Sequence, residues 1–156
     1  EIEKIIKRSS EILGIEIDKD ASQEISKRSR FTPRTANYLL KRCRDYAQVH
    51  GDGDITFDLT EKALSLIEID NMGLDSLDHR YLRSIIEKHS GGPVGVETIA
   101  ATISEDSGTL EDLVEPYLLQ LGFLKRTPRG RVATKAAHEH LGLAFKQTSE
   151  NQQKFL

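Results

Sequence analysis

The sequence has few of the residues that build disulfide frameworks and metal sites. Its 156 residues include one cysteine, one methionine and no tryptophan. Because a disulfide needs two thiols, Cys43 cannot form one within the chain, and a zinc finger built on several cysteines is excluded as well. A single unpaired thiol is compatible with the reducing cytosol.

Long hydrophobic runs are also absent. No apolar stretch approaches the roughly 18–20 residues of a transmembrane helix, and no signal-peptide pattern opens the chain. The composition, with 37% hydrophobic and 30% charged residues, fits a soluble globular protein. The first residue is Glu1 rather than methionine and already lies in a helical pattern, so we expect a piece of a longer protein.

The motifs of several enzyme classes are missing. There is no glycine-rich phosphate loop of the Walker A type, no apolar run ending in acids of the Walker B type, and no Ser-His-Asp arrangement. His138 and His140 lie two residues apart, which differs from the His-Glu-x-x-His spacing of zinc enzymes. We therefore predict no complete catalytic site and no metal site in this chain.

Charged residues are abundant but separated by sign. The net charge of −3 argues against a uniformly basic nucleic-acid coat. Segments 27–44 and 123–135 carry several Lys and Arg and no acid, whereas segment 104–116 carries acids and no base. Any contact with a polyanion is therefore expected to be local.

Hydrophobic periodicity predicts a four-helix cluster in the first half. The helices are expected over about 2–13, 20–29, 33–50 and from 58 on. Thr32-Pro33 is a strong helix start, because a capping hydroxyl precedes a proline at the first helical position. Asp58 and Glu61 resemble a capping box. The predicted core side of the fourth helix is Ala63, Leu64, Leu66 and Ile67. The period breaks over 69–75, so we predict one domain over 1–70.

The second half alternates helices with short extended pieces. The expected elements are a helix begun by Asp75 and ended at 90–92, an extended pair at 93–94, helices over about 96–103 and 109–120, a hairpin, and a last helix capped by Thr134. This order is that of a winged helix, in which the hairpin is the wing. We therefore predict a mainly α chain with a winged-helix domain over 71–142. The polar residues 143–156 are expected to form a disordered tail.

The wing is expected to carry the main functional residues. Arg126, Arg129 and Arg131 surround a turn that contains Pro128 and Gly130, and the hairpin has no acid. Guanidinium groups bind phosphates bidentately, so this tip suits contact with a polyanion backbone. The alternative is a hairpin tip that is merely solvated.

The helix before the wing would ordinarily read bases in the major groove. Here that helix and the turn before it carry only acids: Glu105, Asp106, Glu111, Asp112 and Glu115. Carboxylates repel the phosphates that line the groove, so we infer that this helix does not read sequence. The wing is then expected to contact backbone phosphates nearly independently of sequence, with an Arg in the minor groove as a further option.

The tripeptide Thr-Pro-Arg of the wing, at 127–129, also occurs at 32–34. There it places Arg34 in the first turn of a helix, where free N–H groups and the helix dipole favour an anion. An arginine at that end is unfavourable for the isolated helix but reasonable if a phosphate occupies the site. The alternative is a solvated arginine beside a basic face.

Six segments, taken in order, match one family. They are Phe31–Asn37, Arg44–Ala47, Met72–Asp75, Gly91–Gly95, Glu115–Leu119 and Gly122–Thr134. They closely resemble the carboxy-terminal half of the RuvB family, the bacterial AAA+ motors that drive Holliday-junction branch migration. The resemblance covers about 1–142, and it implies that 1–70 is the small helical ATPase lid and 71–142 the winged-helix head.

The resemblance also implies roles for individual arginines. Arg34 resembles the sensor-2 arginine, which reaches the γ-phosphate of ATP. Arg126 and Arg131 resemble the head arginines that touch the DNA backbone, and Arg129 lies between them and is placed to assist. The family usually has glycine where this chain has Phe31, so we expect the backbone before the sensor-2 helix to be restricted here.

For the intact protein, the resemblance implies an ATP-dependent DNA translocase with Mg as the second cofactor. It would act as a cytoplasmic homohexamer with RuvA and RuvC, on the duplex DNA of Holliday junctions, during recombination, repair and the SOS response. This chain has no Walker motifs, so we expect it alone neither to hydrolyse ATP nor to hold a nucleotide.

Two other classes of function are open. A stand-alone winged-helix transcription regulator needs base readout, and the acidic helix counts against it. The third class is a purely structural protein-interaction module, and the arginine wing counts against it. Binding to two unrelated duplexes across a salt series separates these classes.

Overall fold

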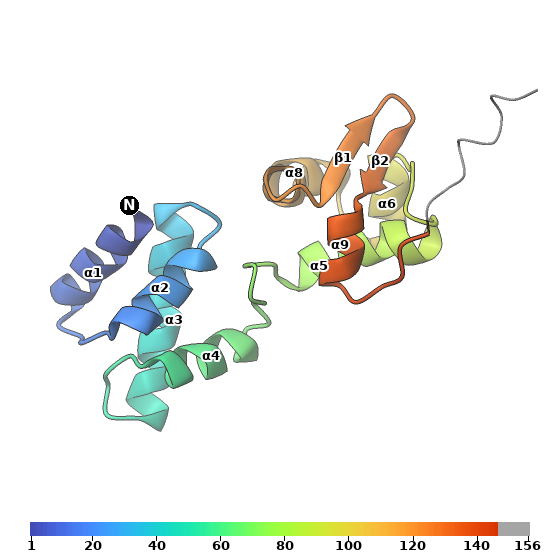
Figure 1. The fold of residues 1–156 in the computed structure, drawn as a ribbon. Coiled ribbons are helices and arrows are strands. Elements are labelled where there is room, and N and C mark those ends of the chain that lie inside the picture. The colour runs from blue at the N-terminus through green and yellow to red at the C-terminus, as the bar shows by residue number, and fades with distance from the viewer. Residues whose placement is uncertain (147–156) are drawn as a thin grey trace, which may run out of the picture. The chain divides into compact units, whose positions relative to one another are not determined.

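The computed structural model describes residues 1–146, and the chain divides into two compact units (Figure 1). The first unit is Glu1–Ser76, and the second begins at Leu77. The prediction of a mainly helical chain with a small hairpin is confirmed. In the described part of the chain, no helix combines the length and the apolar character needed to cross a membrane.

The first unit consists of α1 (Ile2–Leu13), α2 (Lys19–Lys27), α3 (Pro33–His50) and α4 (Phe57–Leu66). The helices pack because each presents an apolar stripe to its neighbours. The buried cluster that results is Ile6, Ala21, Ile25, Ala36, Leu39, Leu40, Cys43, Ala47, Ile55, Ala63 and Leu64. A parallel bridge between Ile17 and Ile55 ties the segment before α2 to the segment before α4.

The helix starts confirm two predicted caps and correct one. Thr32 and Thr134 each accept a hydrogen bond from the backbone N–H three residues on, at 3.2 and 3.4 Å. The cap of α4 is Thr56, whose hydroxyl accepts from Leu59 N at 3.3 Å, and not Asp58. Asp58 lies in the first turn instead, where its charge suits the positive end of the helix dipole.

One predicted core residue of this unit lies at the surface. Leu66 is the last residue of α4 and is 73% exposed. Ala63 and Leu64 are buried as predicted, and Ile67 packs partly against the cluster. At about 3.6 residues per turn, Leu66 lies off the face of α4 that Thr60, Ala63 and Leu64 bury.

A buried arginine connects three parts of the first unit. Arg28 follows α2, is 5% exposed, and pairs with Glu24 at 2.7 Å and with Glu61 of α4. Its Nη1 donates to the carbonyl of Ile69 at 3.4 Å. A buried cation requires such partners, so Arg28 supports the fold and adds little to the basic surface expected over 27–44.

From Ser76 onward the elements follow the order of a winged helix, which confirms that prediction. The helices are α5 (Ser76–Arg83) with the π-helical turn η1 (Ser84–Lys88), α6 (Val96–Ile103), the continuous run α7 (Ser107–Thr109), η2 (Leu110–Val114) and α8 (Glu115–Gln120), and α9 (Lys135–His140). Strands β1 (Leu124–Thr127) and β2 (Gly130–Ala133) pair antiparallel. The extended pair at 93–94 forms only a single bridge, between Val94 and Arg131.

The continuous run α7, η2 and α8, over 107–120, is called the long helix. Its π-helical turn η2 changes which of its side chains face the core. The N–H of Glu115 bonds to the carbonyl of Leu110, five residues back. Pro116, which has no N–H and whose ring disfavours a regular α-helix before it, explains the turn. The extra residue rotates the side chains that follow. Leu113 is 67% exposed, and Glu115, predicted on an acidic surface, is 0% exposed.

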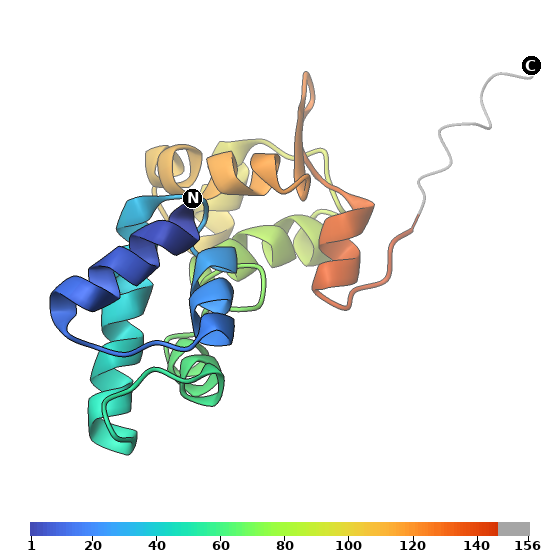
Figure 2. The same ribbon diagram turned by 60° about the vertical axis from the view of Figure 1, so that its left-hand side comes forward.

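The hairpin projects beyond the helices (Figure 2), and backbone hydrogen bonds to Val94 are one of its connections to the rest of this unit. Val94 N donates to Arg131 O at 3.0 Å, and Arg131 N donates to Val94 O at 2.7 Å. A Cβ at residue 130 would lie 2.6 Å from backbone atoms of Val94, and the φ of Gly130 is +134°. Only glycine combines that approach with that conformation.

The end of the chain is described as far as Lys146. Leu143 N donates to His138 O at 2.8 Å, and the Phe145 and His138 rings meet edge to face with centroids 5.1 Å apart. Residues 143–146 thus pack on α9. The predicted disorder of 147–156 lies outside the described residues.

Candidate nucleic-acid interface

The wing places its arginines in two ways. Arg126 and Arg131 are directly opposed in the register of β1 and β2, so their side chains leave the same face of the hairpin. Arg129 lies at the tip, where Thr127 Oγ1 accepts from Arg129 N at 3.3 Å and donates to Gly130 O at 2.8 Å. Two opposed guanidinium groups repel each other unless an anion lies between them.

Glu115 supplies that anion. Arg131 donates through Nε to Oε1 at 3.0 Å and through Nη2 to Oε2 at 3.2 Å. Arg126 donates to Oε2 through Nε at 3.2 Å and through Nη2 at 2.6 Å. The Tyr81 hydroxyl, from α5, donates to Oε1 at 2.8 Å. We call Tyr81, Glu115, Arg126 and Arg131 the wing anchor, because they fasten both strands to the helices.

The wing anchor stays charged despite the burial of its carboxylate. Burial alone would raise the pKa of Glu115, but hydrogen bonds from Arg131, Arg126 and Tyr81 outweigh it and hold that pKa below its ordinary 4.5. Burial and the bond to Glu115 raise the pKa of Tyr81, and the same carboxylate raises the pKa of Arg131. At neutral pH the anchor therefore combines one carboxylate with two guanidiniums and has an excess of positive charge.

The arginines of the wing are accessible from solvent to different degrees. The Arg126 side chain is 48% exposed and that of Arg131 is 20% exposed. Each uses Nε and Nη2 for Glu115, which leaves other N–H groups for a further acceptor. Arg129 is exposed, and its guanidinium has no partner within residues 1–146.

The acidic surface of the long helix is smaller than the sequence predicts. Glu115 belongs to the wing anchor, and Asp106 caps α7 by accepting from Thr109 N at 2.9 Å. Glu111 and Asp112 are exposed. The helix that reads bases in other winged helices thus still presents acids, and no cation, to the solvent.

Arg34 lies in the first unit, in the first turn of α3, and is exposed. Its guanidinium has no partner among the described residues, whereas Arg42 and Arg44 of the same helix pair with Asp45 at 3.0 and 3.1 Å. Phe31, three residues before Arg34, has a φ of +57°, a conformation that costs non-glycine residues roughly 1–2 kcal/mol. The backbone that leads to Arg34 thus has a strained conformation at Phe31.

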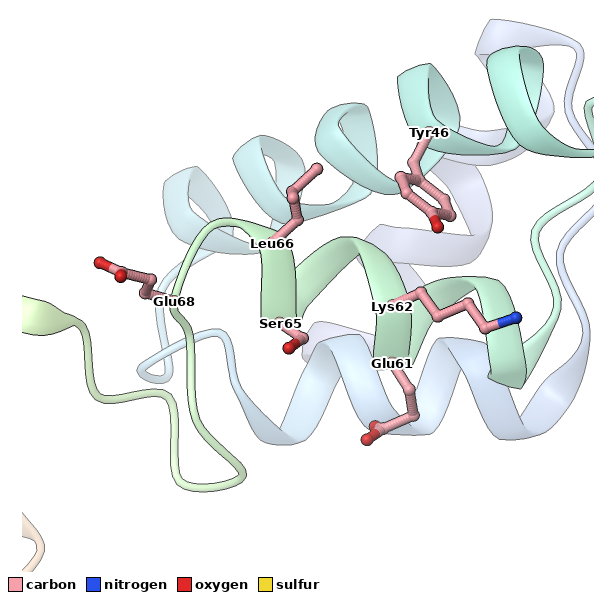
Figure 3. A pocket seen from close by; sticks show the side chains of 6 residues that line it. All are labelled: Tyr46, Glu61, Lys62, Ser65, Leu66 and Glu68. Atoms are coloured by element: carbon pink, nitrogen blue, oxygen red, sulfur yellow. The ribbon is translucent and has the colours of Figure 1, made fainter.

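Two other features of the first unit, a surface hollow and a buried thiol, include none of the predicted site residues. A surface hollow of about 670 Å³ lies between α3 and α4 (Figure 3), lined by Tyr46, Glu61, Lys62, Ser65, Leu66 and Glu68. Burial raises the pKa of the Cys43 thiol to about 12. A thiol of that kind packs in the core and is neither nucleophile nor metal ligand at neutral pH.

Sequence reasoning missed the wing anchor. It treated 109–120 as a regular α-helix, which puts Glu115 at the surface, and it did not link Tyr81 to that helix. The signal that could have found the anchor is an acid between Val114 and Pro116 in an otherwise apolar stretch, facing a wing with arginines and no acid of its own.

The fold and the wing define a winged-helix protein that carries a separate small helical unit. Residues 1–70 match the model of the RuvB AAA lid domain, and residues 71–142 match the model of the RuvB C-terminal winged helix domain. The chain therefore belongs to the RuvB family.

Its relatives are longer proteins. The chain is 55% identical over 152 residues to the Holliday junction branch migration complex subunit RuvB of Dehalococcoides mccartyi strain CBDB1, a match that covers 97% of this chain and 44% of that protein. The Thermotoga maritima RuvB Holliday junction branch migration motor matches with a TM-score of 0.90 at 44% identity, over 94% of this chain and 49% of that one. A mutant of the Thermotoga protein matches with the same TM-score at 43% identity. The chain thus spans about half the length of these relatives.

Proposed function

We propose that this chain is the lid and the DNA-binding head of an ATP-driven DNA translocase that drives Holliday junction branch migration in recombination and repair. Residues 1–70 are the lid, and residues 71–142 are the head. Membership of the RuvB family supports the proposal. The structural observation that carries it is a wing with accessible arginines beside a long helix that presents acids.

The wing grips the backbone of duplex DNA through Arg126, Arg131 and Arg129. Phosphates accept bidentate hydrogen bonds from guanidinium groups, and such contacts carry no sequence information. A motor that moves along arbitrary DNA needs contacts of this kind. Glu111 and Asp112 oppose entry of the long helix into the major groove, because they face the phosphates on its rim. A single wing binds weakly, so several copies on one duplex supply the useful affinity.

In the intact protein, the lid senses nucleotide through Arg34. ATP with Mg binds to residues beyond this chain, and Arg34 reaches its γ-phosphate. Loss of that phosphate releases the arginine and moves the lid, which couples hydrolysis to motion. The intact protein works in the cytoplasm as a homohexamer with RuvA and RuvC. The exposure of Arg34, and the lack of a partner for it within residues 1–146, support this role.

Binding of this chain to two unrelated duplexes across a salt series tests the head. We expect equal and weak affinity for both duplexes. The log–log salt slope should be about −2.7, because three arginines neutralise about three phosphates. A preference above about tenfold for one sequence would favour the alternative, a stand-alone winged-helix transcription regulator.

The variant Arg34→Ala tests the lid in the intact protein. We expect loss of ATP-driven branch migration with the fold retained, because Arg34 supports no other residue of the described chain. Arg42→Ala is the matched control, since it removes a cation from the same helix that is paired with Asp45. Normal branch migration by Arg34→Ala contradicts the sensor role.

A further inference from the structure

We infer that Glu115 is a positioning residue for the DNA contact: it holds Arg126 and Arg131 with their unused N–H groups available to phosphates, and it stays bound to them when DNA binds. The inference rests on the proposed function, because it concerns how the wing meets a duplex. Glu115 itself is 0% exposed, so it acts only through the two arginines.

Each guanidinium has an inner part, Nε and Nη2, that binds Glu115, and an outer part, Nη1, that does not. Glu115 takes the Nε and Nη2 groups of both arginines at 2.6–3.2 Å. The Nη1 groups of both make no hydrogen bond within the described residues, and the side chains are 48% and 20% exposed. A phosphate can therefore bind the outer part without displacing the carboxylate. Arg126, the more exposed of the two, is the first to be reached.

Ordering the arginines in advance removes a cost of association. A long side chain loses conformational entropy when it is immobilised, and side chains that must be ordered at an interface lower the affinity for this reason. In the wing anchor this ordering takes place when the head folds. Without Glu115, Arg126 and Arg131 are two like charges directly across the hairpin, and they would move apart.

Glu115 also has an electrostatic effect of the opposite sign. Its negative charge lowers the positive potential of the wing, so its removal would strengthen attraction to DNA if positioning were unimportant. Glu111 provides the matched comparison. It lies on the same helix, is exposed, and makes no hydrogen bond or ion pair within the described residues.

The decisive experiment compares Glu115→Gln with Glu111→Gln in this chain, since each removes one negative charge. Duplex affinity is measured at about 0.1 M salt, where charges within about 10 Å still interact. We expect Glu111→Gln to raise the affinity by up to about twofold. We expect Glu115→Gln to lower it by about 3- to 10-fold, because both arginines must then be ordered on binding.

The salt dependence gives a readout that a merely structural role would not change. If Glu115→Gln loses a phosphate contact, its log–log salt slope flattens by about 0.9. Equal gains in affinity for the two variants, with an unchanged slope, overturn the inference and leave the role of the wing intact. A wild-type chain that does not bind duplex DNA overturns the proposed function of the head as well.

A second measurement uses only the wild-type chain, so it does not depend on how well Glu115→Gln folds. Nuclear magnetic resonance of the arginine Nε–H groups should show slow solvent exchange for Arg126 and Arg131 and fast exchange for Arg129. This difference should persist after the duplex is added. Fast exchange of all three in the free chain, or loss of protection of Arg126 and Arg131 on binding, contradicts the inference.

Discussion

The tripeptide Thr-Pro-Arg adopts two different structures in this chain. At 32–34 it begins α3, and at 127–129 it makes the turn between β1 and β2. The threonine hydroxyl accepts a nearby backbone N–H in both places, so the threonine does not decide the outcome. The next residue does: Thr35 continues a helix, whereas Gly130 takes a φ of +134° that starts a returning strand.

Arg34 and Arg129, the arginines of the two tripeptides, are both exposed and have no partner within residues 1–146, but Arg126 and Arg131, which flank the second tripeptide, differ from them. Arg34 has no partner within residues 1–146, whereas Arg126 and Arg131 share a buried carboxylate. An unpartnered arginine suits a ligand that comes and goes, because no internal contact has to break. Anchored arginines suit a surface that must meet a repeating backbone in one geometry. The neighbours of a basic residue, rather than the motif around it, therefore decide which of these uses it serves.

The largest expected effect comes from the glycine that separates the two structures. Gly130→Ala should destabilise the second unit by about 3–4 kcal/mol, because it adds left-handed strain and a clash with the Val94 backbone. Gly142→Ala is the control: its φ is +68°, but a Cβ there meets nothing within 4 Å, so it should cost only about 1 kcal/mol. Urea unfolding followed by circular dichroism measures both. Equal losses would mean that the approach of Val94 is unimportant.

The next effect tests the contrast between anchored and unpartnered arginines. Arg131→Ala should lower the free energy of unfolding by about 2–3 kcal/mol, because it leaves the buried carboxylate of Glu115 short of donors. Arg34→Ala should change it by no more than about 0.5 kcal/mol. Adding Glu115→Gln to Arg131→Ala should recover part of the loss. No recovery in the double variant would show that the loss has another cause.

The same residues show which features of the fold and the site could be predicted from the sequence. Caps such as Thr32 and Thr134 depend on residues within one turn, so local pattern was enough to predict them. The sequence predicts Asp58 as the cap of α4, whereas the structure has Thr56; both are good capping residues, and only the backbone distinguishes them. Glu115 was misplaced for a different reason. Its partners, one of them 34 residues away, are set by tertiary packing that no local period contains, and the π-helical turn that Pro116 favours shifts the period on which the prediction relied.

Acid should weaken the second unit through the wing anchor. The pKa of Glu115 is lowered below its ordinary 4.5, so the native state keeps the carboxylate charged where the unfolded state protonates it. The resulting stabilisation is complete above about pH 4.5 and is lost as the pH falls towards the native pKa. The pKa values of Tyr81 and Arg131, which contact Glu115, are raised, so these groups do not account for a loss of stability in this range. Between about pH 5 and pH 3, the temperature of thermal unfolding should therefore fall less in Glu115→Gln than in the wild type.

The smallest expected effect compares the two threonine hydroxyls. Thr32→Ala should cost about 1 kcal/mol, because it removes the cap of an 18-residue helix. Thr127→Ala should cost about 0.5 kcal/mol or less, since its hydrogen bonds are exposed and water replaces them. Serine at either position keeps the hydroxyl and should restore most of the loss. Equal losses in the two alanine variants would contradict the expectation that water replaces the hydrogen bonds of the turn.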